Sequence, residues 1–136
     1  MNTLYISQLT SDALKESGCD PSIIGKLDNH SNIILDLNNL PSIHISIEEG
    51  EYVWLWALLG EHSAKIIPQR GNDLLQALMK GCHFSHNSQL QLAIQDDELM
   101  LKVLVHPKYL SDGHVFSVAL NGFFDELSHF CGAFLR

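Results

Sequence analysis

The stretch that decides the fold is Glu51-Tyr52-Val53-Trp54-Leu55-Trp56-Ala57-Leu58. Successive side chains of a strand point to opposite faces, so Val53 and Leu55 would face one side and Trp54 and Trp56 the other. Both faces are apolar, whereas a strand of a small antiparallel sheet normally has one apolar and one polar face. The pattern therefore predicts a strand that needs a second cover, either from a helix of the same chain or from another protein.

Two hairpins are predicted around this stretch. Ile43, Ile45 and Ile47 alternate with polar residues, and the turn at Glu49-Gly50 joins this segment to the Trp strand. Asp96-Asp97 is a second turn signal between two alternating segments, in which we expect Leu90, Leu92 and Ile94 to point inward. Together with one apolar run, the strand segments cover residues 32–37, 42–48, 51–58, 89–95 and 99–105.

Three helices are expected. The first covers about residues 3–17 and ends at Gly18; the second runs from Pro68 or Gln69 to Lys80. Asp112 can cap the third, whose apolar stripe is Phe116, Leu120, Phe123, Leu127, Phe130 and Phe134. A short helical turn is also predicted at 23–25. The order helix, three strands, helix, two strands, helix predicts an α+β domain with a five-stranded antiparallel sheet.

Composition limits the classes of function. The 136 residues suit one domain, 1–136, and carry a formal net charge of −8 with no run of Lys and Arg longer than two residues. Nucleic acid and anionic membrane surfaces are therefore unfavourable partners. The three cysteines follow no framework spacing, which predicts buried thiols in a reducing compartment. The N-terminus does not read as a signal peptide, so we expect a soluble cytoplasmic protein.

Catalytic and metal sites are not expected. The acidic clusters at 48–51 and 96–98 fall in the two predicted hairpin turns, where turn formation and solvation explain them better than acid–base chemistry. Cys82, His83 and His86 form a cluster that lacks the fourth ligand of a tetrahedral zinc site. We therefore predict no enzymatic activity, no cofactor and no bound metal.

Seven short segments resemble one family in their order and spacing. They run almost from end to end of the chain: 17–22 (SGCDPS), 28–31 (DNHS), 41–43 (PSI), 54–57 (WLWA), 81–84 (GCHF), 110–113 (LSDG) and 116–123 (FSVALNGF). On these segments the chain resembles type III secretion chaperones of class IB, the multi-effector chaperones of invasion-associated secretion systems in Gram-negative bacteria. Gly71-Asn72-Asp73 departs from the pattern, because it is a poor start for the middle helix.

The resemblance implies an acidic, virulence-associated homodimer without enzymatic activity. Such chaperones hold an N-terminal effector segment in a non-globular form and help to deliver it to the secretion ATPase. By the same resemblance, the middle helix and the strand after it would form the dimer contact, through Leu74, Leu75, Leu78, Met79, Leu90 and Leu92.

Effector contacts are predicted from the apolar strands. Trp54 and Trp56 would form an apolar platform, with His44 at the surface of the sheet beside it. Strand 32–37, including Ile33 and Leu35, would pair with an effector segment if it is a sheet edge.

Several alternatives remain open. One of the chain's own helices could cover the tryptophans, and the last helix could be a dimer seam instead of core. The acidity could serve solubility or attract basic effector segments. In the competing class of function, the protein binds a small ligand or acts as an enzyme through a pocket beside the sheet.

Overall fold

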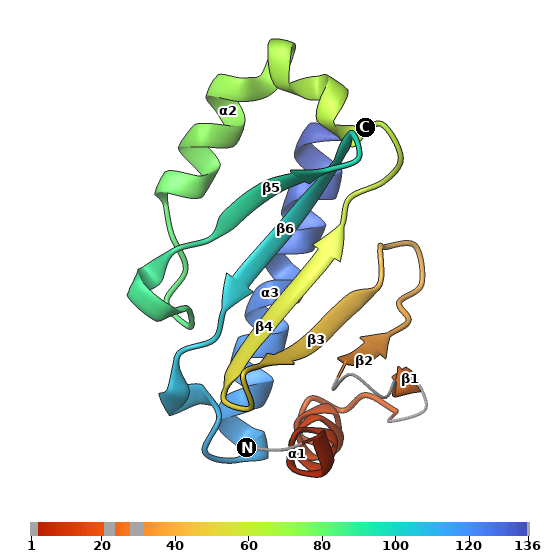
Figure 1. Cartoon of the computed structure of the whole chain (residues 1–136), viewed down its shortest axis with the longest axis vertical. Coiled ribbons are helices and arrows are strands. Elements are labelled where there is room, and N and C mark those ends of the chain that lie inside the picture. The colour runs from red at the N-terminus through yellow and green to blue at the C-terminus, as the bar shows by residue number, and fades with distance from the viewer. Residues whose placement is uncertain (1–2, 21–23, 28–31, 136) are drawn as a thin grey trace.

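The computed structural model describes residues 3–20, 24–27 and 32–135. Six antiparallel strands form one sheet in the order β1-β2-β3-β4-β6-β5 (Figure 1). The strands are β1 (Ile24–Leu27), β2 (Asn32–Leu35), β3 (Ile43–Glu48), β4 (Tyr52–Leu58), β5 (Gln91–Gln95) and β6 (Glu98–Leu104). The helices are α1 (Thr3–Glu16), α2 (Ile67–Met79) and α3 (Gly113–Phe134).

The predicted α+β class and the order of three helices and five strands are confirmed, and the sheet gains one short strand. The prediction of a helical turn at 23–25 is wrong for Ile24 and Gly25, which begin β1, while Ile23 lies outside the described residues. β1 pairs antiparallel with β2. That pairing hydrogen-bonds the backbone of a segment too short to form a stable helix by itself, which explains the difference.

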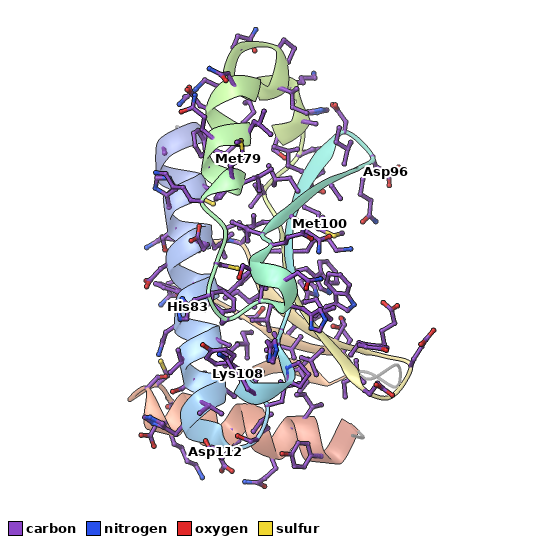
Figure 2. The ribbon with its side chains drawn as sticks, turned by 90° about the vertical axis from the view of Figure 1, so that its left-hand side faces the viewer. Met79, His83, Asp96, Met100, Lys108 and Asp112 are labelled. Atoms are coloured by element: carbon purple, nitrogen blue, oxygen red, sulfur yellow. The ribbon has the colours of Figure 1, made fainter. Side chains whose placement is uncertain are left out.

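Alternating burial separates the sheet into two faces. On the inner face of β4, Val53, Leu55 and Ala57 are fully buried. Trp54 and Trp56 point to the opposite face, here called the outer face, and are half-buried. α3 runs along the inner face, behind the sheet in Figure 1. No helix that the structure describes lies across β4 and β6 on the outer face (Figures 1 and 2).

The long helix α3 is core, and it begins where the sequence predicts. The Asp112 carboxylate accepts a hydrogen bond of 2.9 Å from the Val115 backbone N–H, as expected of an N-cap. All six residues of the predicted stripe are buried, which assigns the stripe to core rather than to a dimer seam: Phe116, Leu120, Phe123, Leu127, Phe130 and Phe134.

The crossing of α1 and α3 is close. α1 ends as predicted, because Gly18 has a φ of 77° and Cys19 N–H donates to the Leu14 carbonyl at 2.8 Å. Gly113 is the first residue of α3, and it lies against Asp12 of α1. A Cβ on Gly113 would lie 2.5 Å from Cβ of Asp12. A residue larger than glycine at this position would force the two helices apart.

Both predicted hairpins form. The β3–β4 turn has positive φ at Glu49 (55°) and Gly50 (75°), and the two-residue β5–β6 turn has positive φ at Asp96 (50°) and Asp97 (66°). Two positive φ values in a two-residue loop match the right-handed twist of the strands. Ile94 lies opposite the buried Leu99 and so points to the inner face as predicted, but its side chain is 62% exposed. It lies on β5, the edge strand of the sheet, where the core no longer covers the side chains.

Candidate protein-binding surfaces

The first surface is a shallow hollow in the outer face, here called the Trp hollow. It spans β3, β4 and β6 and has a volume of about 350 Å³. Met100, at one side of it, lies on the side of the sheet away from α3 (Figure 2). The hollow is lined by Ser46, Ile47, Glu48, Trp54, Trp56, Met100 and Lys102.

A chain of contacts holds Trp56 in one orientation. Its indole stacks on His44, the cross-strand neighbour in β3, with ring centroids 3.8 Å apart. The indole N–H donates to the Ser46 hydroxyl at 2.9 Å, and that hydroxyl donates to the Asn32 side-chain oxygen at 2.8 Å. Three strands thus orient one indole, so its exposed edge is a preorganised apolar surface.

His44 was predicted to lie at the surface of the sheet, and the structure shows it there, half-buried. Its Nδ1 is buried and has no hydrogen-bond partner among the described residues. Desolvation lowers the pKa of His44 from its ordinary value, and the nearby carboxylate of Asp36 raises it by a smaller amount. The burial of the imidazole that stacks on Trp56 therefore favours its neutral form.

Lys102 brings a positive charge to the Trp hollow. Its cross-strand neighbour in β4 is Trp56, and its Nζ lies 4.4 Å from the centroid of the Trp54 ring. Such a cation over an indole face is attracted by the ring quadrupole. Glu48, on β3 at the other side of β4, also lines the hollow and is exposed.

The second surface is an apolar groove between α2 and β5, here called the α2–β5 groove. It has a volume of about 470 Å³ and includes Leu75, Leu78, Leu92 and Ile94 among its lining residues. Leu75 is 56% exposed, and Met79, at the end of the same helix, is 75% exposed. Figure 2 shows where Met79 lies on α2.

The residues predicted for a dimer contact divide into two groups. Leu74 and Leu90 are buried, at 4% and 5% exposure, and hold α2 and the segment before β5 on the core. Leu75 and Met79 are exposed, and Leu78 and Leu92 are half-buried. α2 is continuous through Gly71, so the poor helix start in the sequence does not interrupt it.

A third hollow lies between α1, β2 and α3 and was not predicted from the sequence. It has a volume of about 150 Å³ and includes Leu14, Leu37 and Phe124 among its lining residues. Phe124 is 40% exposed. The adjacent pair Phe123-Phe124 could have indicated this hollow. Two neighbouring residues on a helix do not share a face, so one of the two rings has to lie outside the apolar stripe.

Two predicted effector contacts need correction. Ile33 and Leu35 point into the core, with 1% and 2% exposure, so neither side chain is available to a partner in this conformation. β2 is also not a sheet edge, because β1 and β3 pair with its two sides. The edges are β1 and β5.

The cysteine and histidine cluster has a structural explanation. Cys82 is buried, and its thiol lies 3.9 Å from the Gln89 carbonyl oxygen; burial raises the pKa of this thiol. Cys19 is exposed, contrary to the prediction that the thiols are buried. Among the described residues, no three His, Cys, Asp or Glu side chains are arranged to hold a metal ion. None of the described helices is long and apolar enough to cross a membrane.

Comparison with known proteins identifies the family. Residues 18–96, more than half of the chain, match the model of the invasion protein B family. The chain belongs to that family. Its members are type III secretion chaperones, so the resemblance drawn from the sequence motifs is confirmed. The chain is thus a virulence-associated secretion chaperone by family.

Relatives and a solved structure extend this result. The chain is 50% identical over the full length of both proteins to the surface presentation of antigens protein SpaK of Salmonella typhimurium, and equally to that of Salmonella typhi. Its fold is similar to a chain in the structure of the HopA1–SchA chaperone–effector complex, with a TM-score of 0.61 and 14% identity. That alignment covers 96% of each chain, and it supports the fold alone.

Proposed function

We propose that this member of the invasion protein B family is a cytoplasmic homodimer that binds the N-terminal region of several secreted effectors. It keeps that region non-globular and presents it for export, with the secretion ATPase as the receiving partner. No catalytic step and no cofactor belong to this function. The structure named for the HopA1–SchA chaperone–effector complex, which shares the fold, gives a precedent for effector binding.

The observation that carries the proposal is the outer face of the sheet. Trp54 and Trp56 are half-buried there, without a helix over them among the described elements, and Trp56 is fixed by His44 and Ser46. Large aromatic side chains on a rigid strand contribute strongly to binding energy. An extended segment that lies across them buries apolar surface without having to fold, which suits several unrelated effector sequences.

The α2–β5 groove supports the dimer. Of the groove residues, Leu75, Ile94 and Ile67 expose 56%, 62% and 37% of their surface, and Met79 at the end of α2 exposes 75%. A cluster of exposed apolar residues of this kind is costly in a soluble monomer and is typical of an interface. A second copy related by a two-fold axis would present the same groove, so the exposed apolar residues of both copies would be buried against each other.

The alternative is a small-ligand protein or an enzyme with a pocket beside the sheet. A site for a small molecule is normally a concave cavity in which a few polar groups converge. The Trp hollow is instead shallow, and its charged residues, Lys102 on β6 and Glu48 on β3, lie on opposite sides of β4. This geometry favours an elongated ligand over a compact one.

Co-expression tests the proposal. Each secreted protein of the bacterium's type III system is produced with the tagged chain, and the purified complex is treated with protease. We expect protection of one N-terminal segment in more than one effector, identified by mass spectrometry. Recovery of small metabolites alone, with no protected segment from any effector, would support the alternative function.

Two variants locate the contact. Trp54→Ser combined with Trp56→Ser removes the platform and should abolish protection of the segment. Val118→Ser is the matched control, because Val118 is an apolar residue of α3 with 37% exposure. Unfolding midpoints of both variants confirm that they fold. Full protection by a folded Trp double variant would place effector binding on a different surface.

A further inference from the structure

The Trp hollow holds one cationic group in a fixed position. Lys102 projects from β6 on the same face as Met100 and extends its ammonium over Trp54, 4.4 Å from the ring centroid. The contact orients a side chain that would otherwise sample many rotamers, so part of the entropy cost of placing this charge is already met in the free protein.

That cation has no acidic partner in the described part of the chain. The ion pairs found there join His62 to Asp97, Arg70 to Asp73 and His114 to Glu16, and none includes Lys102. The absence is notable in a chain with a net charge of −8, in which carboxylates are twice as numerous as Lys and Arg. A positioned ammonium without a counter-ion beside an apolar platform is suited to an anionic group from outside.

We propose that the Trp hollow selects extended peptide segments that place an Asp or Glu side chain against the Lys102 ammonium beside Trp54 and an apolar side chain over Trp56. This inference rests on the function proposed above and specifies the chemistry of the segment that the outer face accepts. The acidic residue fixes the position of the peptide along the hollow. The remaining contacts are apolar and can be made by many different side chains.

The strand geometry defines the spacing of the segment. Lys102 lies opposite Trp56, and Leu104 lies opposite Trp54, two residues further along each strand. Alternate side chains of an extended peptide repeat at about the same interval, roughly 7 Å. Because the Lys102 ammonium lies over the Trp54 ring, a peptide acid that reaches it lies beside Trp54, and a peptide residue two positions away reaches Trp56. Glu48 lies opposite Tyr52, two residues from Trp54 in the other direction, so a second acid on that side would be repelled.

Selection from a random peptide library tests the inference. The library is displayed on phage and selected separately on the wild-type chain, on Lys102→Glu and on Lys108→Glu. Lys108 is the matched control, because its Nζ also lies over an aromatic ring, 5.4 Å from the centroid of Tyr109, but it does not line the Trp hollow. Both variants change the net charge by the same amount.

The wild type and Lys108→Glu should enrich peptides with one acidic residue among alternate apolar residues. Lys102→Glu should enrich Lys or Arg at that position. One enriched peptide is then synthesised with Glu, Gln or Lys there and titrated by tryptophan fluorescence, which reports on this surface because Trp54 and Trp56 are the only tryptophans. The Glu peptide should bind the wild type about fivefold more tightly than the Gln peptide, and Lys102→Arg should retain the preference.

Different failures have different meanings. If peptides change the Trp emission but show no acidic preference, or the same preference on Lys102→Glu, the inference is wrong while the proposed function stands. If no peptide of any charge changes the Trp emission, and co-expressed effectors also lack a protected segment, the proposed function fails and the inference fails with it.

Discussion

Trp56 stacks on His44 across strands β4 and β3, with ring centroids 3.8 Å apart and ring planes 12° from parallel. The contact brings a titratable ring into the surface on which we place effector binding. Desolvation lowers the pKa of His44 below its ordinary value of 6.5, an effect that the Asp36 carboxylate opposes. The folded chain therefore prefers the neutral ring.

Stability should fall as the pH drops below about 6.5 because of this histidine. Between that pH and the lower pKa of the folded state, the unfolded chain binds a proton at His44 and the folded chain does not. Above pH 6.5 the contribution is fully present. His44→Phe keeps a ring against Trp56 but removes the titration, so its urea midpoint should fall less between pH 7.5 and 5.5 than that of the wild type. An equal fall in both proteins would contradict the assignment.

Gly122 should not tolerate a side chain, whereas Gly132 on the same helix should. A Cβ on Gly122 would lie 2.5 Å from Cε1 of Phe84, a fully buried ring, while a Cβ on Gly132 meets nothing within 4 Å. We expect Gly122→Ala to lower the free energy of unfolding by about 1–3 kcal/mol. Gly132→Ala should raise it by about 0.5–1 kcal/mol, because alanine is the better helix former. Urea denaturation measures both, and destabilisation by neither variant would refute the packing argument.

Asp112 should stabilise the start of α3 through its side chain. The carboxylate accepts from the Val115 backbone N–H at 2.9 Å, and φ at Asp112 is −156°, an extended cap conformation. Asp112→Ala should cost about 1 kcal/mol of unfolding free energy. Asp112→Ser should recover most of that loss, since a hydroxyl can accept the same bond. Equal destabilisation by Ala and Ser in urea melts would show that the hydrogen bond is not the cause.

The α2–β5 groove should control the oligomeric state. Leu75 is 56% exposed on α2, and a charged side chain there would be buried without a partner in a dimer formed through this groove. We expect Leu75→Asp to shift the molar mass, measured by light scattering after gel filtration, from dimer to monomer. Val118→Asp, on α3 with 37% exposure, should leave a dimer. A dimeric Leu75→Asp protein would place the interface elsewhere.

Local pattern predicted the elements well. The Phe and Leu stripe of α3 repeats at helical spacing, and all six of its residues are buried. The turns at Glu49-Gly50 and Asp96-Asp97 formed as predicted, because positive φ at neighbouring residues is a local property of the chain. The segment at Ile24 and Gly25 was misjudged, because β1 depends on its pairing with β2 and not on its own few residues.

Exposure of the candidate site was harder to predict. Ile33 and Leu35 belong to an apolar run that looked available, but β1 covers the edge of β2 and the core encloses their side chains. Conversely, Leu75 belongs to the apolar face of α2 and is exposed, since the groove beside β5 is open. Periodicity identifies the apolar face of an element, but whether another element covers that face depends on contacts between distant parts of the chain.

The sequence by itself determined that residues 52–58 form a strand with two apolar faces and that one long helix carries a single apolar stripe. Only the tertiary structure decided which face of the strand that helix covers. α3 lies over the side of Val53 and Leu55 and leaves Trp54 and Trp56 on the outer face. The physical reason is that one helical stripe buries one face of a sheet, and the choice between two apolar faces depends on how all the strands and helices pack together.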